Sequence, residues 1–205
     1  TLESTQLDTT AGEAGTSASD SSAAKPQAAD SSPAAASPAT VSADSSAAHG
    51  VQRERWLDIG GAKIADLTHH ADYPDSPDKV EVLPTLETGG DGKDYGERLW
   101  GYLTPPEDGD YLFWIAADDS GELWLSTDAD PANAVQIAAT STWTPKRNWD
   151  KSPTQASAPI PLKGGQRYYI EARHKQADQK DNLSVAWQPP GGERTVIDTQ
   201  YLTPE

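Results

Sequence analysis

Two adjacent carboxylates, Asp118 and Asp119, are the residues of this chain best suited to bind a cation. They begin a short acidic loop, Asp118-Asp119-Ser120-Gly121, between the strand-like runs YLFWIA and ELWLS. Adjacent carboxylates repel each other, and aromatic strands on both sides offer them no compensating charge. Calcium takes six to eight oxygen ligands, some of them from carboxylates. The loop therefore predicts a calcium site, although the same four residues taken alone also fit a solvated turn.

The first fifty residues differ in composition from the rest of the chain. Residues 1–50 are mostly Ala, Ser, Thr, Asp and Pro, with one Lys and no aromatic residue, and their only larger aliphatics are Leu2, Leu7 and Val41. Such a segment buries too little apolar surface to offset the entropy of ordering its backbone, about 1–2 kcal/mol per residue. We expect residues 1–50 to be a disordered linker and residues 51–205 to be one folded domain.

Strand signals dominate the folded part. Runs rich in aromatic and β-branched residues, separated by Pro and Gly, predict six strands: 99–103, 110–116, 122–126, 136–139, 167–174 and 183–188. Residues 168, 170 and 172 share one apolar face of their strand, whereas Glu171 and Arg173 face the other way. Helical turns are expected only at 62–68 and 131–134. This pattern indicates an all-β, antiparallel sandwich or barrel.

Several phrases of the chain resemble the protective-antigen-fourteen (PA14) family of β-sandwich domains. They are ERWLDIGG (54–61), ADLTHHADYPDSPD (65–78), YGERLWGYLTPPEDGDYLFWIAADDSGELWLSTD (95–128), APIPLKGGQRYYIEARHK (158–175) and DNLSVAWQPPGG (181–192). The resemblance covers about three quarters of the chain. It implies an antiparallel β-sandwich and, in the lectin branch of the family, two consecutive Asp residues that are joined by a cis peptide and hold Ca²⁺.

The resemblance also implies a second calcium-binding loop, which we expect at 174–182, between YYIEAR and LSVAW. Gln176 and Asp178 match the family's ligand positions best, and Asp181 and Asn182 are the alternates. Lys175 and Lys180 bring positive charge to the same loop, although their long flexible side chains can point outward. With ligands from both loops, the ion would keep open positions that two adjacent hydroxyls of a sugar can fill. The predicted metal ligands are thus Asp118, Asp119, Gln176 and Asp178.

Two tryptophans could add stacking against the apolar face of a sugar ring. Trp143 and Trp149 lie in the turn-rich segment STWTPKRNWDKSP, which shows no strand alternation, so that one of them could be exposed. Trp114, Trp124 and Trp187 lie in expected strands and fit core or sheet-face positions. Core packing is also the alternative role for Trp143 and Trp149.

Charge and composition exclude several classes of function. The formal net charge of −16 disfavours nucleic acid and anionic membrane surfaces as partners. No apolar run approaches the roughly 20 residues of a membrane span, so no membrane insertion is expected. The absence of Cys excludes disulfides and thiol catalysis. These features fit a secreted or surface-exposed bacterial protein in which the domain is a monomeric unit of a larger multidomain chain.

Three functions remain to be weighed. The preferred one is a calcium-dependent, lectin-like module that binds the vicinal diols of a monosaccharide or a glycan end, as in adhesion. The first alternative is a structural or assembly spacer that holds a structural Ca²⁺ and no sugar. The second is a module that targets an attached glycoside hydrolase. We do not expect the domain itself to be an enzyme, because adjacent Asp residues on one tight loop are poorly placed to flank a glycosidic bond at about 5–5.5 or 6.5–9.5 Å.

Overall fold

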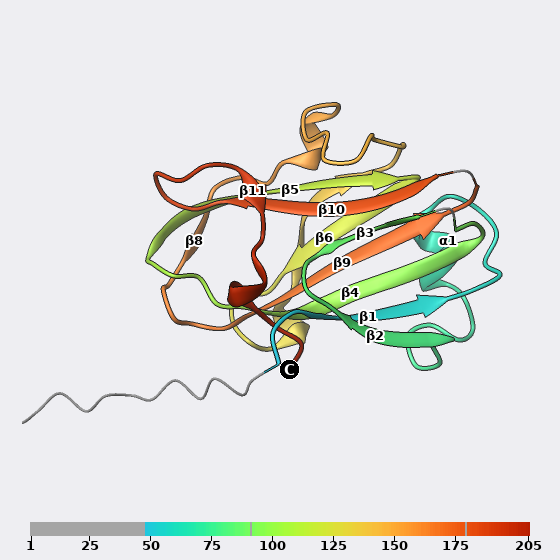
Figure 1. The fold of residues 1–205 in the computed structure, drawn as a ribbon, viewed down its shortest axis with the longest axis horizontal. Helices are drawn as coiled ribbons and strands as arrows, with labels where there is room; N and C mark the ends of the chain where they lie inside the picture. The colour runs from blue at the N-terminus through green and yellow to red at the C-terminus, as the bar shows by residue number, and fades with distance from the viewer. Residues whose placement is uncertain (1–47, 91, 179) are drawn as a thin grey trace, which may run out of the picture. The chain divides into compact units, whose positions relative to one another are not determined.

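The computed structural model describes residues 48–90, 92–178 and 180–205 of the chain. Most of the expected linker, residues 1–50, lies outside this part. The described residues form two antiparallel sheets that face each other as a β-sandwich (Figure 1). The predicted fold class is therefore confirmed.

The larger sheet has seven strands in the described residues, in the order β2-β1-β4-β9-β6-β7, with β12 also paired to β4. Their bounds are β1 Val51–Trp56, β2 Lys79–Leu83, β4 Tyr95–Leu103, β6 Ser120–Leu125, β7 Val135–Thr140, β9 Tyr168–Gln176 and β12 Leu202–Thr203. Along β4 and β9, Tyr95 pairs with Gln176 and Leu103 with Tyr168. The start of β4 and the end of β9 therefore lie at the same end of the sandwich.

The smaller sheet has five strands in the described residues, in the order β11-β10-β5-β8, with β3 also paired to β10. Their bounds are β3 Glu87–Gly90, β5 Gly109–Asp118, β8 Ile160–Leu162, β10 Asp181–Gln188 and β11 Thr195–Val196. Asp118, the last residue of β5, pairs with Asn182 near the start of β10. The acidic loop between β5 and β6 is consequently at the same end of the sandwich as Gln176, where the chain crosses from one sheet to the other.

The core lies between the sheets and is filled by alternate residues of their strands. Tyr168, Ile170 and Ala172 of β9 belong to it, as the alternation predicts, together with Leu99 of β4 and Phe113 of β5. Glu171 and Arg173 lie on the opposite face of β9, where they form an ion pair. The buried strands place the loops at both ends of the sandwich on a packed support.

A second, smaller apolar cluster packs on the outer face of the larger sheet. It contains Trp56, Ile59 and Leu67, with Tyr73 against them. Leu67 belongs to α1 (Ile64–Thr68), which the sequence predicted as a helical turn, as it did the 3₁₀ turn η1 (Pro131–Asn133). Two further 3₁₀ turns are η2 (Pro153–Gln155) and η3 (Thr199–Tyr201). Within the described residues, no helix has the length and apolarity required to span a membrane.

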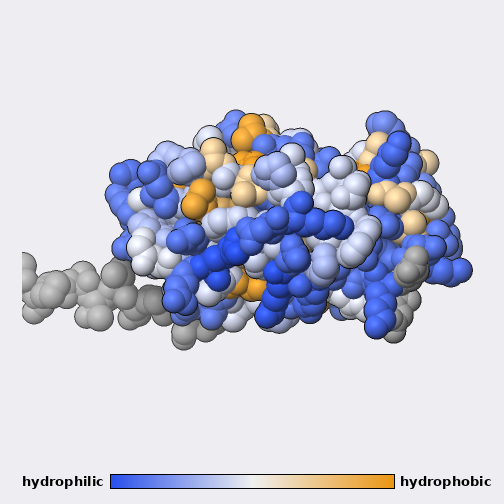
Figure 2. All heavy atoms as spheres, turned by 90° about the horizontal axis from the view of Figure 1, so that it is seen from above, coloured by the Kyte–Doolittle hydropathy of each residue, from blue (hydrophilic) through white to orange (hydrophobic). Residues whose placement is uncertain are grey.

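The surface is predominantly hydrophilic. The face shown in Figure 2 is mostly polar, with small separate hydrophobic areas. Among the described residues, the exposed large hydrophobic side chains are Val80, Val82, Val135 and Trp143. Single exposed aliphatic residues are common on protein surfaces. An exposed Trp beside an acidic loop is less common, so the end of the sandwich where Trp143 lies is a candidate binding surface.

Candidate functional site

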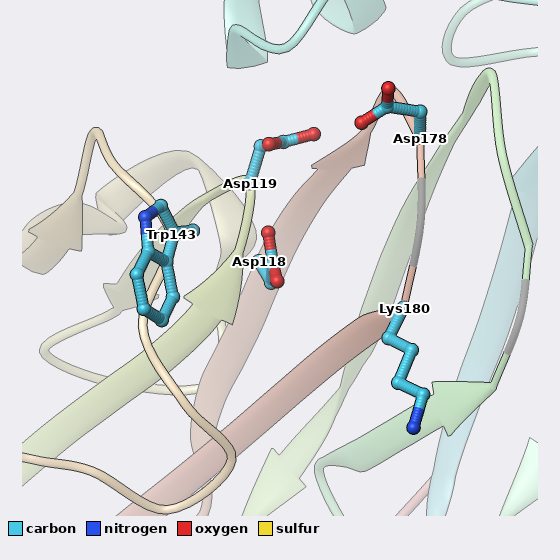
Figure 3. Close-up of a pocket in the computed structure, with 5 residues that line it drawn as sticks. All are labelled: Asp118, Asp119, Trp143, Asp178 and Lys180. Atoms are coloured by element: carbon cyan, nitrogen blue, oxygen red, sulfur yellow. The ribbon is translucent and has the colours of Figure 1, made fainter.

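A cavity of about 420 Å³ opens at the end of the sandwich where β5 and β9 end. Asp118, Asp119, Trp143, Asp178 and Lys180 line it. Figure 3 shows the carboxylates of Asp119 and Asp178 pointing toward each other across the cavity, with Asp118 between Trp143 and the loop that bears Lys180. Three of the four predicted metal ligands and one predicted aromatic residue therefore meet in one place.

The acidic loop is a tight connection between the two sheets. β5 ends at Asp118 and β6 begins at Ser120, so that only Asp119 lies between the two strands. The peptide bond between Asp118 and Asp119 is cis. Both aspartates are half-buried. At the back of the loop, the Ser120 hydroxyl donates a hydrogen bond of 2.6 Å to the carbonyl of Ala62, which fixes the loop to the segment before α1.

The second loop is shorter than the sequence indicated. We expected a loop at 174–182, but β9 continues to Gln176 and β10 begins at Asp181. His174 and Gln176 continue the alternation of β9 on the core face, and both are fully buried. The loop that faces the cavity therefore spans residues 177–180, of which residue 179 lies outside the described part.

Lys175 points into the protein and not outward. Its side chain is fully buried, and its ammonium donates hydrogen bonds to the carbonyls of Gly61, at 2.6 Å, and Gln176, at 2.9 Å. Burial lowers the pKa of this ammonium, while the charges of Asp66, Asp94 and Asp119 act in the opposite direction. Lys175 thus fastens the end of β9 to the segment before α1, and it takes no part in the cavity wall.

Asp119 connects the two loops directly. One of its carboxylate oxygens accepts a hydrogen bond of 2.8 Å from the backbone N–H of Ala177. Its own backbone N–H donates to the carbonyl of Lys175 at 3.1 Å. The side-chain amide of Gln176 donates to the carbonyl of Asp178 at 2.6 Å. These bonds fix the second loop in position opposite the acidic loop.

Like charges crowd the Asp118 carboxylate. Burial raises the pKa of Asp118, and the charges of Asp119 and Asp181 raise it further, whereas His174 and Lys151 act in the opposite direction. A bound cation would favour the ionised carboxylate. A positive charge in the cavity would therefore stabilise the ionised Asp118 carboxylate.

A buried charged network lies directly beneath Asp118. His174 places its Nδ1 2.9 Å from a carboxylate oxygen of Glu97 and its Nε2 2.6 Å from the carbonyl oxygen of Asp118. Both neighbours are acceptors, so both ring nitrogens must donate, and the ring must be a protonated imidazolium. Glu97 also pairs with Arg53 and Arg55 and accepts from the Thr88 hydroxyl at 2.6 Å. This network positions the backbone of the acidic loop.

The pair Glu97–His174 predicts a pH window for stability. Burial alone would lower the pKa of His174, but its bond to Glu97 raises the pKa above the ordinary 6.5. Burial would raise the pKa of Glu97, but His174 and Arg53 hold it below the ordinary 4.5. A raised His pKa stabilises the fold at pH below 6.5, and this stability is lost as pH rises through the folded pKa. A lowered Glu pKa stabilises the fold above pH 4.5, and this stability is lost in acid.

Thermal unfolding of the EDTA-treated domain should therefore show its highest midpoint between about pH 4.5 and 6.5, with a decline on each side. The variant His174→Gln should lose the decline at alkaline pH, because no proton is released from position 174. An unchanged alkaline decline in that variant would show that other groups cause it.

Asp181 and Asn182, the alternate ligands, lie at the start of β10 with both side chains buried. The Tyr95 hydroxyl donates to one carboxylate oxygen of Asp181 at 2.8 Å. The amide of Asn182 donates to the carbonyl of Thr144 at 3.0 Å. Neither residue is among the described residues that line the cavity. Their contacts support the start of β4 and the loop 141–157, which carries Trp143.

The structure separates the two tryptophans of the turn-rich segment. Trp143 lines the cavity and its side chain is 54% exposed. Trp149 is half-buried and is not among the described lining residues. Trp114 and Trp187 are both buried, in agreement with the predicted core or sheet-face positions, and Trp187 belongs to the core between the sheets. Trp143 is therefore the aromatic residue that the structure brings to the carboxylates.

The oxygen atoms at this end of the sandwich suit a hard cation, although the side chains alone do not form a closed metal cluster. Within the described ranges, no three His, Cys, Asp or Glu side chains lie close enough together to hold a metal ion. Buried side-chain oxygens of Gln176, Asp181 and Asn182 have no hydrogen-bond partner in the same part of the chain. Carboxylate, amide and carbonyl oxygens are the ligands that calcium prefers. The residues present therefore fit calcium in their chemistry.

Reasoning from sequence missed three residues that support the cavity: Glu97, His174 and Thr144. Thr144 is bonded to the backbone of Ala117 through both its N–H and its hydroxyl, which joins the Trp143 loop to β5. The alternation of β9 could have placed His174 on the buried face. Nothing local indicates that Glu97, 77 positions away, is its partner.

Comparison with known proteins identifies relatives of this chain. Residues 89–201 match the family model described as the PA14 domain. A mouse N-acetyl-beta-glucosaminyl-glycoprotein 4-beta-N-acetylgalactosaminyltransferase 1 is 34% identical over 157 residues, which are 73% of this chain. The match covers only 15% of the mouse protein.

Solved structures share the fold at low sequence identity. The PA14 sugar-binding domain from an RTX adhesin has a TM-score of 0.59 and 14% identity, covering 78% of this chain and all of that chain. The A domain of epithelial adhesin 6 from Candida glabrata, in complex with Galb1-3GlcNAc, has a TM-score of 0.54 and 14% identity, covering 78% of this chain and 88% of that chain. At this identity the two structures establish the β-sandwich fold alone.

Proposed function

Because this chain belongs to the PA14 domain family, we propose that its β-sandwich is a carbohydrate-binding module in which Asp118 and Asp119 hold Ca²⁺ and the ion contacts the sugar. The observation that carries the proposal is the cavity itself. It combines the two adjacent aspartates with Asp178 on a facing loop and an exposed Trp143 on its wall. Two structural neighbours are described as sugar-binding or sugar-bound domains, which supports the same function here.

Each residue has a defined role in this proposal. The carboxylates of Asp118, Asp119 and Asp178 supply negative charge to the cation. The unpartnered oxygen of Gln176 is the candidate for a neutral ligand, and the backbone carbonyls of residues 177, 178 and 180 are candidates for the remaining ligands. The amide of Gln176 holds the carbonyl of Asp178, so the glutamine also orders the loop that it belongs to.

Calcium, when bound, supplies coordination positions that two adjacent sugar hydroxyls can fill in place of water. Because hydroxyls replace water of similar polarity, the exchange orients the sugar more than it strengthens binding. Trp143 offers an apolar surface beside these positions, against which the C–H face of a sugar ring can pack. We expect millimolar affinity for a single sugar, with stronger attachment through several copies of the module.

The module is proposed to work on an extracellular or surface protein of larger size. The relative in mouse is several times longer than the matched segment, since the match covers 15% of its length. That relative is named as a glycosyltransferase, so a PA14 module beside a catalytic region is one arrangement in which this chain could act. We infer that the module itself binds, because its cavity presents adjacent carboxylates on one loop instead of two carboxylates that flank a bond.

Retention on immobilised glycans tests the proposal. Residues 48–205 should be retained by a matrix that carries galactose or Galβ1-3GlcNAc in the presence of Ca²⁺, and EDTA should release them. Re-addition of Ca²⁺ should restore retention, whereas Mg²⁺ should not, because Mg²⁺ demands a smaller octahedral site. A glycan array extends the same test to other sugars with adjacent hydroxyls.

Two results would decide against this function. Retention that persists in EDTA would show that the sugar is bound without the ion. No glycan binding at saturating Ca²⁺, together with a calcium-linked rise in the unfolding midpoint, would identify a structural ion and favour the spacer function.

A further inference from the structure

The loop that carries Trp143 is anchored more firmly than its exposure suggests. Residues 141–157 connect β7 to the segment before β8. Arg147 forms a two-bond ion pair with Glu87, and Asp150 forms another with Arg194. A loop anchored in this way presents its side chains in fixed positions, which lowers the entropy lost on binding.

Other bonds join the loop to the strand that ends in Asp118. The buried amide of Gln155 donates to the carbonyls of Ile115, at 2.9 Å, and Asn148, at 2.7 Å. Thr144 is bonded to Ala117, next to Asp118 in sequence. The position of the Trp143 backbone is thus coupled to that of the acidic loop.

The indole of Trp143 has its own support. The ammonium of Lys151 lies 3.4 Å from the centre of the Trp143 ring. The same ammonium donates a hydrogen bond to the backbone carbonyl of Trp143. A cation over an indole face is attracted by the electrons of the ring. One side chain therefore holds both the backbone and the ring of the exposed tryptophan.

We propose that Lys151 is a positioning residue that fixes the Trp143 indole at the wall of the cavity and restricts sugar stacking to the ring surface that Lys151 leaves uncovered. This inference rests on the proposed carbohydrate-binding function. An exposed Trp without such support would sample several rotamers and would have to be ordered when the sugar binds. With one ring face occupied by the ammonium, a sugar that is oriented by the cation must approach from the other side.

The charge of Lys151 distinguishes a residue that positions Trp143 from a residue that helps to hold the ion. Its positive charge acts on the Asp118 carboxylate, so it opposes a cation in the cavity. Removing the charge should leave calcium binding equal or stronger. If Lys151 positions Trp143, removing the charge should instead weaken sugar binding. The affinities for calcium and for sugar should therefore respond differently to the same substitution.

The test uses residues 48–205 with Lys151→Gln and Lys151→Arg, and with Lys163→Gln as the matched control. Lys163 follows β8 at the other end of the sandwich and pairs with Asp108 on the surface. Acrylamide quenching of Trp143 fluorescence reports how accessible the indole ring is in the absence of sugar. The Trp143 signal is obtained by subtracting the signal of the corresponding Trp143→Phe protein. Calorimetric titrations then give the affinities for Ca²⁺ and, at saturating Ca²⁺, for galactose.

Lys151→Gln should increase the quenching of Trp143 and weaken galactose binding about three- to tenfold, the effect of freeing one side chain. Its calcium affinity should not fall. Lys151→Arg should restore galactose binding to within about twofold, because a guanidinium also stacks on indole. Unchanged quenching in Lys151→Gln, or unchanged galactose affinity, would overturn the inference. If the parent protein binds Ca²⁺ but neither galactose nor any arrayed glycan, the proposed function fails and this inference fails with it.

Discussion

Replacing Asp119 with asparagine is expected to weaken calcium binding by on the order of 100-fold and to abolish sugar retention. The affinity of an oxygen site depends on the number of charged ligands that it offers. Asn keeps the size of the side chain and the oxygen that accepts from the N–H of Ala177. The substitution therefore removes the charge and retains the bond between the two loops. Calorimetric titration of EDTA-stripped protein with CaCl₂ measures the change.

Asp110→Asn is the matched control for this substitution. Asp110 is exposed and lies near the start of β5, whereas Asp118 is its last residue. The same loss of charge at that end of the strand should leave calcium affinity unaltered. The ion should also raise the unfolding free energy of the parent domain by about 2.7 kcal/mol at a concentration of 100 Kd, and Asp119→Asn should lose this increase. Equal calcium affinity in the two variants would contradict the assignment of Asp119 as a ligand.

Glu97→Gln is expected to have the largest effect on stability. The Glu97 side chain is fully buried, with Arg53 Nη2 at 2.6 Å, Arg55 Nη2 at 3.1 Å and His174 Nδ1 at 2.9 Å from its oxygens. Removing its charge leaves three cationic groups without their shared partner. Loss of one member of a buried ion-pair network costs about 3–5 kcal/mol. For a domain of this size the unfolding midpoint should fall by about 6–20 °C.

Glu81→Gln provides the comparison for that variant. Glu81 also pairs with Arg53, at 2.7 Å, but its side chain is 52% exposed. A surface pair of this kind contributes at most about 1 kcal/mol. Scanning calorimetry of both variants in EDTA compares the unfolding midpoint after loss of the buried carboxylate with that after loss of the exposed one. A similar midpoint for Glu97→Gln and Glu81→Gln would show that the network under Asp118 does not stabilise the domain.

The strands that the sequence predicted are those with strong local signals. All six expected strands are present, in β4, β5, β6, β7, β9 and β10, although the expected ranges 122–126 and 167–174 each extend one residue beyond the observed strand. Their aromatic and aliphatic residues alternate, and the apolar face packs into the core. The first strand, VQRERW, was missed because its core-facing Arg53 and Arg55 look like surface residues. Burial of these arginines depends on Glu97, a partner more than 40 positions away.

The candidate site was predictable only in part for the same reason. Asp118 and Asp119 are conspicuous as neighbours between two aromatic runs, and the structure places both in the cavity with Asp178. The second loop was predicted too long, at 174–182, because the resemblance implied a loop between YYIEAR and LSVAW. His174, Lys175 and Gln176 each have a distant partner inside the fold, which lets β9 continue to Gln176. The length of the loop therefore depends on long-range contacts that the resemblance does not reveal.

The most direct measurement of the proposed mechanism is a calorimetric titration of sugar into one sample of residues 48–205 in two states. Galactose, or the strongest ligand from the glycan array, is titrated first into EDTA-stripped protein and then into the same protein at saturating Ca²⁺. We predict no binding heat in the first titration and a saturable, millimolar binding curve in the second. An equal binding curve in both titrations would contradict an ion-mediated site at Asp118 and Asp119.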